Sequence, residues 1–205
     1  MPRTYRLGER AVSMDATRVR IIEAAIELSI ELGISGMTMR QIAHRADVAP
    51  GTLRNHFPTR RELDHAMVER LIAEAPLPEL SIFDGTRSIQ ERLQRLIRVT
   101  GIFLDQSTRL YRMWLRERLL SSPWAEAGEA YGARWDQLMR AALGEQADED
   151  DAMAILRSVL QPSFFESVRA GTRTTEEVSQ LIAAAIVPWF VARSAEEPGE
   201  RRGGP

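Results

Sequence analysis

The sequence predicts an all-α protein of about nine helices, and two observations favour this fold class. Apolar residues recur three and four positions apart along most of the chain, which is the spacing of one helical face. Ser or Thr followed three residues later by Gln or Glu marks a helix N-terminus. This pattern occurs at Thr38, Thr59, Ser88 and Thr174. No stretch reads as a convincing β-strand, and no internal repeat is visible.

Composition indicates an ordinary globular protein, because hydrophobic residues make up 44% and charged residues 27% of the 205 residues. No apolar run reaches the roughly 18 residues of a membrane span. The N-terminus lacks the apolar segment of a secretory signal. The sequence contains no cysteine, which excludes disulfides and thiolate metal sites. We therefore expect a cytoplasmic protein with no membrane segment, cofactor or bound metal.

The first helix is predicted over residues 15–32, because apolar residues recur at helical spacing and Gly33 follows as a C-terminal cap. The preceding residues, 1–14, carry arginines without such periodicity. We expect a flexible arm there.

A helix-turn-helix is predicted over residues 38–57. Thr38 and Gln41 form the capping box of its first helix. Ala49 and Pro50 restart a helix, because proline extends its predecessor and itself suits the first helical position. The outward face of this second helix is small, polar and cationic, which suits contact with phosphates and base edges.

Local charge also favours nucleic-acid binding. Between Gly36 and Arg61 five arginines stand against one acid, Asp47, so the local charge is +4 in a chain that totals −2. A cluster of one sign is what neutralising a phosphate backbone requires. The predicted DNA-binding residues are Thr38, Arg40, Ala49, Pro50, Gly51, Thr52, Arg54, Asn55, His56 and Arg60. Of these, Arg40, Thr52 and Asn55 are assigned to base edges, and Arg54, His56 and Arg60 to phosphates.

Further helices are predicted at residues 60–74, 88–104, 109–120, 124–143, 149–169 and 174–193. Pro162 is expected to kink the helix over 149–169. The acids Asp148 to Asp151 are interpreted as favourable charges at a helix N-terminus, because the turn glycine and interspersed ligands of a calcium loop are absent.

Residues 15–74 resemble the N-terminal domain of the TetR family of bacterial transcriptional repressors, in the segments ELGISGMTM and RQIAHRADVAPGTLRNHF and the capped helix from Thr59. The chain departs from the family pattern at Asp47, usually glycine, at Ala49, usually a hydroxyl cap, and at Arg54, usually a phosphate-contacting tyrosine. The resemblance implies a homodimer that binds a palindromic operator in double-stranded DNA and is released by a small-molecule effector.

The resemblance also implies an effector cavity among the middle helices, and a four-helix dimer interface built from residues 149–169 and 174–193. Candidate pocket residues are Phe103, Tyr111, Trp114, Trp124, Trp135, Phe164 and Phe165. Aromatic residues favour an apolar or aromatic effector. An anionic effector remains the alternative, because the same region contains the arginines Arg95, Arg98, Arg112 and Arg116.

The expected organisation is a flexible arm (1–14), a DNA-binding domain (15–75), a ligand-binding and dimerisation domain (76–193) and a disordered tail (194–205). An enzyme is disfavoured, because the three histidines form no metal or triad pattern and no glycine-rich phosphate loop occurs. A small-molecule-binding or protein-interaction module with a degenerate helix-turn-helix is the alternative, because of the departures at Asp47, Ala49 and Arg54.

Overall fold

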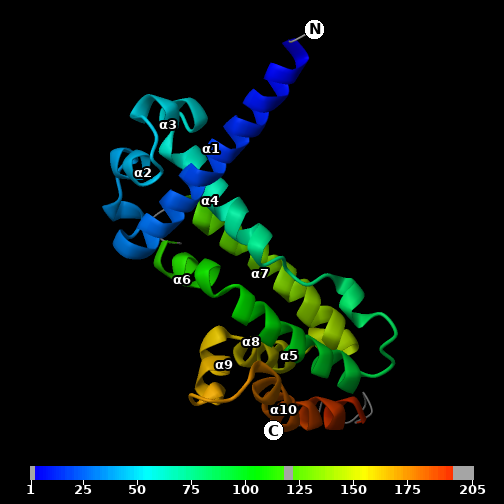
Figure 1. Ribbon diagram of the computed structural model, residues 1–205. Helices are drawn as coiled ribbons and strands as arrows, with labels where there is room; N and C mark the ends of the chain where they lie inside the picture. Colours follow the sequence, from blue (N-terminus) through cyan, green and yellow to red (C-terminus); the bar gives the residue numbers. More distant parts are fainter. Residues whose placement is uncertain (1–2, 118–121, 196–205) are drawn as a thin grey trace. The chain divides into compact units, whose positions relative to one another are not determined.

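The computed structural model describes residues 3–117 and 122–195, and within these ranges the chain contains helices and no strand (Figure 1). Side chains are described except at residues 3–14, 114, 116–122 and 195. The α-helices are α1 (Arg3–Leu32), α2 (Met39–Arg45), α3 (Pro50–His56), α4 (Arg60–Glu74), α5 (Ile89–Gln106), α6 (Thr108–Glu117), α7 (Ser122–Leu143), α8 (Asp150–Val159), α9 (Pro162–Arg169) and α10 (Thr175–Ala195). Three short 3-10 helices accompany them: η1 (Ile34–Gly36), η2 (Leu80–Phe83) and η3 (Gly144–Asp148). The all-α prediction is confirmed.

The chain forms two compact units. Unit 1 holds Met1–Ala75 with Arg109–Glu129, and unit 2 holds Pro76–Thr108 with Ala130–Pro205. Residues 109–129, which the sequence led us to place in the second domain, thus pack with the first unit. The functions assigned to the two parts of the chain stay predictions.

In unit 1, α1 packs against α2 and α4, and α2 packs against α3. Ile21, Ala25 and Leu28 are buried, as the periodicity of α1 predicts, whereas Leu32 at its end is 43% exposed. Helix α1 begins at Arg3, so residues 3–14 are helical in the structure rather than irregular. No proline interrupts them, and helix formation propagates once a long helix has nucleated. Their flexibility stays a prediction.

Unit 2 is organised by the contact between α5 and α10. A Cβ atom added at Gly101 of α5 would lie 2.7 Å from Ser179 Oγ and 2.9 Å from Thr175 Cγ2 of α10. Only glycine permits this close approach of the two helices. The core around the contact includes Leu93, Leu96, Val178, Ile182 and Phe190. The Thr174 capping box holds the start of α10, since Thr174 N–H donates to Glu177 Oε2 at 2.7 Å and Glu177 N–H donates to Thr174 Oγ1 at 3.3 Å.

The single kinked helix predicted over residues 149–169 is wrong. Gln161 is extended (φ −68°, ψ 142°), α8 ends at Val159, and Pro162 occupies the first turn of α9. Proline forces the residue before it out of the helical conformation, so two helices form instead of one kinked helix. The acids at positions 150 and 151 lie in the first turn of α8, as predicted.

The described residues were also compared with the requirements of a membrane span and of a metal site. Among the described residues, no helix is long and apolar enough to cross a membrane. Within the same part of the chain, no group of three or more His, Asp or Glu side chains could hold a metal ion. Of the predicted tail, Ser194 belongs to α10, while residues 196–205 lie outside the described residues.

Candidate nucleic-acid interface

The turn between α2 and α3 is closed by the backbone. Asp47 adopts a left-handed conformation with φ 52°, which aspartate tolerates better than most residues. Val48 N–H then donates to the Ala43 carbonyl at 3.0 Å. Ala43 is 1% exposed, so a small side chain lies at this crossing. The predicted helix-turn-helix is present.

Both helix starts match their sequence signals. Thr38 N–H donates to Gln41 Oε1 at 2.8 Å and Gln41 N–H donates to Thr38 Oγ1 at 3.2 Å, which completes the capping box of α2. Ala49 is extended (φ −65°, ψ 145°) and supplies no side-chain cap, and Pro50 stands in the first turn of α3. Proline at this position has no N–H that needs a partner and is pre-set for the helix, so it favours the start of α3 although no side chain caps it.

Helix α3 is anchored by one face and open on the other. Leu53 and Phe57 are each 1% exposed. A Cβ atom at Gly51 would meet nothing within 4 Å, so the packing of this chain does not require glycine there. The predicted DNA-binding residues Thr38, Arg40, Ala49, Pro50, Gly51, Arg54 and Asn55 are exposed, and Thr52, His56 and Arg60 are partly exposed. The structure therefore brings Ala49 through His56 onto one accessible helix, with Thr38 and Arg40 at the start of α2.

Some of the five arginines in this region form ion pairs with acidic side chains of unit 1. Arg45 pairs with Glu31 at 2.8 Å and Glu27 at 3.4 Å, and its hydrogen bond lowers the pKa of Glu31 below the ordinary value. Arg61 pairs with Glu126 at 3.0 Å. Within residues 3–117 and 122–195, Arg40 and Arg54 have no ion pair, so they offer the least compensated charge of the five.

Arg60 has a structural role that the sequence did not indicate. Its Nε–H donates to Asp64 Oδ1 at 2.9 Å, Nη1 donates to the Met37 carbonyl at 3.0 Å, and Nη2 donates to the Ile34 carbonyl at 3.0 Å. Three of the five guanidinium N–H groups are thus engaged within unit 1. The assignment of Arg60 to a phosphate stays a prediction, and the structure adds a second role, because the side chain ties the start of α4 to η1.

A further cation was missed by sequence reasoning. The guanidinium carbon of Arg18 lies 5.0 Å from the centroid of the Phe57 ring, within the range of a cation–π contact. Arg18 is exposed and has no ion pair with a described residue. No local sequence pattern links α1 to the residue that follows α3, so only the tertiary structure reveals this contact.

The predicted effector residues are divided between the two units. In unit 2, Phe103 lies with its ring centroid 5.3 Å from that of Trp135 and 6.3 Å from that of Tyr131. Burial raises the pKa of Tyr131 to about 12. Phe165 is 2% exposed, whereas its neighbour Phe164 is 36% exposed.

The other three predicted effector residues belong to unit 1. Trp124 is fully buried, and its Nε1 has no hydrogen-bond partner in the described part of the chain. Tyr111 is partly buried. The side chain of Trp114 lies outside the described residues. The effector assignment therefore stays a prediction, with Phe103 and Trp135 the members that the structure places in ring contact.

Comparison with known proteins bears on both the fold and this face. The profile of a family described as "Bacterial regulatory proteins, tetR family" matches residues 21–67, which contain α2 and α3. The HTH-type transcriptional repressor KstR of Rhodococcus jostii is 27% identical over 158 residues, which cover 75% of this chain and 73% of KstR. An HTH-type transcriptional regulator of Haemophilus influenzae is 31% identical over 115 residues, or 54% of each chain. The fold is similar to that of AibR in complex with isovaleryl coenzyme A and operator DNA, with a TM-score of 0.61, 17% identity, and coverage of 82% of this chain and 96% of that one.

Proposed function

We propose that this chain is a sequence-specific DNA-binding transcriptional regulator of the tetR family of bacterial regulatory proteins, a repressor released from its operator by a small molecule. The observation that carries the proposal is the open face of α3. Its inward side chains, Leu53 and Phe57, are buried, while its exposed side presents Arg54 and Asn55. A helix anchored on one side and polar on the other can enter the major groove.

The departures from the family pattern at Asp47 and Ala49 are compatible with this function. Asp47 takes the left-handed conformation that the turn needs, and Pro50 starts α3 without a hydroxyl cap. Neither departure alters the packing between α2 and α3, where the buried side chain of Ala43 lies. Relatives named as transcriptional regulators also favour a regulator over an enzyme, and we propose a cytoplasmic location on the same ground.

We further propose a homodimer that reads a palindromic operator, since two-fold symmetric proteins read two-fold symmetric sites. Exposed apolar residues of α10 support this assembly. Val178 and Ile182 are buried in the core of unit 2, but Leu181 is 46% and Trp189 36% exposed on the same helix. Two large apolar side chains left partly exposed on one helix indicate a surface that another chain can cover.

Effector control would act through α4. Ion pairs join this helix to its neighbours in unit 1, since Arg70 contacts Glu23 of α1 at 2.8 Å, and Arg109 of α6 contacts Glu74 of α4 at 3.6 Å. A displacement of α6 would therefore be transmitted to α4 and the helix-turn-helix. A ligand releases DNA only if it binds better to the conformation whose recognition helices are wrongly spaced.

The test is a titration of DNA from the protein's own upstream region, by fluorescence anisotropy over a series of salt concentrations. We expect saturable binding that weakens steeply with salt, because phosphate contacts release counterions. Binding of equal strength to the upstream DNA and to a scrambled duplex would contradict sequence-specific regulation.

A further inference from the structure

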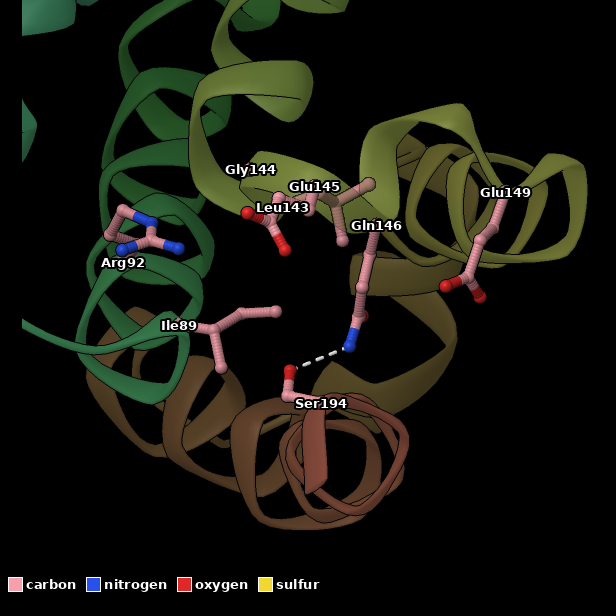
Figure 2. A pocket seen from close by; sticks show the side chains of 8 residues that line it. All are labelled: Ile89, Arg92, Leu143, Gly144, Glu145, Gln146, Glu149 and Ser194. Carbon is pink, nitrogen blue, oxygen red and sulfur yellow. Dashed lines mark hydrogen bonds between the residues drawn. The ribbon is translucent and has the colours of Figure 1, made fainter. Parts of the chain in front are cut away.

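A polar cavity of about 520 Å³ lies in unit 2, at the meeting point of α5, α7, η3 and α10. Its volume falls within the roughly 300–1,000 Å³ of small-molecule sites. Figure 2 shows Arg92 on one side of the space and Gln146 on the opposite side, with the Glu145 carboxylate between them, Ile89 below Arg92, and Ser194 at the bottom, hydrogen-bonded to Gln146. None of these residues belongs to the DNA-binding face or to the predicted aromatic pocket.

Arg92 supplies the positive charge of this cavity. Its Nε–H donates to the carbonyl of Ala142 at 2.9 Å, which fixes the guanidinium against the end of α7. Nη2 lies close to Gly144, where an added Cβ would stand 3.3 Å from it. Among the described residues, the N–H groups on Nη1 and Nη2 have no acceptor. This edge has the geometry that binds a carboxylate through two parallel hydrogen bonds.

Glu145 supplies the negative charge. It stands in the first turn of η3 and has no ion pair with any residue that the structure describes. In particular, Arg92 and Glu145 line one cavity without pairing with each other. A single ligand that carries one negative and one positive group can therefore pair with Arg92 and with Glu145 at the same time.

The remaining polar groups of the cavity are largely satisfied within the protein. Glu149 pairs with Arg193 at 2.6 Å. The Gln146 amide is 4% exposed and fixed, because Nε2 donates to the Phe190 carbonyl at 2.9 Å and to Ser194 Oγ at 2.6 Å. Gln146 Oε1 is a buried acceptor without a donor in the described part of the chain. A ligand with a hydrogen-bond donor would suit this side of the cavity better than a second anion.

From this arrangement we infer a binding site for a small zwitterion, an α-amino acid with an apolar side chain. Its carboxylate binds the free edge of Arg92, its ammonium group binds Glu145, and its side chain packs on Ile89 and Leu143. Glu145 is exposed and Arg92 partly exposed, so the site is open to solvent, and one positive and one negative group of the ligand against these partners leave no net charge in it. The site does not require the proposed DNA-binding function, because every residue in it belongs to unit 2.

Isothermal titration calorimetry of the full-length protein without DNA tests this site, with L-leucine as the probe. Two analogues separate the two charges: 4-methylpentanoate lacks the ammonium group and isopentylamine lacks the carboxylate. We expect L-leucine to bind and each analogue to bind about tenfold weaker or less, as loss of a charged hydrogen bond implies. An analogue that binds as tightly as L-leucine would overturn the assignment to a zwitterion.

Variants then locate the site. Glu145→Gln keeps the shape and removes the charge, so we expect L-leucine to bind at least about tenfold weaker. Asp148→Asn is the matched control, because Asp148 lies in the same η3 helix with a 94% exposed side chain and outside the cavity. Arg92→Lys keeps the positive charge but cannot form two parallel hydrogen bonds to a carboxylate, so L-leucine should bind more weakly. Thermal unfolding of this variant reports whether its fold is intact. L-leucine binding that is unchanged in Glu145→Gln, or no binding to the wild type with a Kd below about 1 mM, would refute the proposal.

Discussion

Arg60 and Asp64 form an ion pair across one turn of α4, with 2.9 Å between Nε and Oδ1 and only 8% of the Asp64 side chain exposed. The same guanidinium donates to the carbonyls of Ile34 and Met37. Arg60 therefore holds the segment before α2 against the start of α4. A residue that the sequence assigns to a phosphate is thus also part of the framework that positions α2 and α3.

The first prediction follows from this contact. Arg60→Ala removes the cation that faces a buried carboxylate and the donors to two carbonyls, so the free energy of unfolding should fall by about 2 kcal/mol or more. Urea denaturation measures the change, with Arg54→Ala as the control at an exposed site. A stable Arg60→Ala protein with a reduced salt dependence of DNA binding would instead restore the phosphate role.

The second prediction concerns Arg54 on α3. Arg54 is exposed and has no ion pair among the described residues, so Arg54→Ala should leave stability unchanged and weaken binding to all DNA sequences similarly. The slope of log K against log salt should fall by about 0.9, the value for one phosphate contact. Arg98→Ala is the control, because Arg98 pairs with Glu176 in unit 2. A changed base preference with an unchanged slope would assign Arg54 to base edges.

The third prediction concerns the contact of α5 with α10. Gly101→Ala places a Cβ atom 2.7 Å from Ser179 Oγ and 3.2 Å from Phe165 Cε1, so it should destabilise the protein by about 1–3 kcal/mol. Gly132→Ala in α7 meets nothing within 4 Å and should stabilise by up to about 1 kcal/mol through helix propensity. Thermal unfolding of the two variants should therefore shift in opposite directions. An increase in the melting temperature of both variants would mean that α5 and α10 can move apart without loss of stability.

The fourth prediction tests the dimer. Ile182 is 2% exposed within the core of unit 2, so a charge there would unfold the protein and would not report on the dimer interface. Leu181→Glu places the charge on the exposed side of α10, where burial in an interface would cost about 3 kcal/mol and raise the dimer Kd roughly 150-fold. Multi-angle light scattering should show a dimer for the wild type and for Gln180→Glu, and a monomer for Leu181→Glu. A monomeric wild type at micromolar concentration would contradict the assembly.

The fifth prediction concerns pH. The Thr174 backbone N–H and then its hydroxyl lower the pKa of Glu177 below the ordinary value of 4.5. Because the folded-state pKa is depressed, the stabilising contribution of Glu177 is present above pH 4.5 and is lost as the pH falls through the folded value. In an NMR titration, Thr174→Val should raise the pKa of Glu177 only partway, because the backbone donor remains. Thr172→Val, outside the capping box, should leave it unchanged; an equal change in both variants would argue against the box.

The sequence by itself determined the helical fold, the helix starts and the helix-turn-helix. These features depend on local chemistry: Thr38 caps α2 through a residue three positions away, and Pro50 fixes the start of α3. The buried side of each helix also follows from spacing, as at Leu63, Met67 and Leu71 of α4. Such signals need no knowledge of the rest of the chain, because the interacting groups are neighbours in sequence.

Only the tertiary structure decided which charges are available and where cavities lie. In the sequence, the five arginines between Gly36 and Arg61 contribute equally to the local charge. In the structure, Arg45, Arg60 and Arg61 have partners, which come from α1, η1, α4 and α7. The cavity lined by Arg92 and Glu145 likewise needs residues 53 positions apart, whose approach depends on how α5 meets the end of α7. The physical reason is that compensation of a charge and the shape of a cavity depend on distances in space, and helical periodicity specifies only the face of each helix.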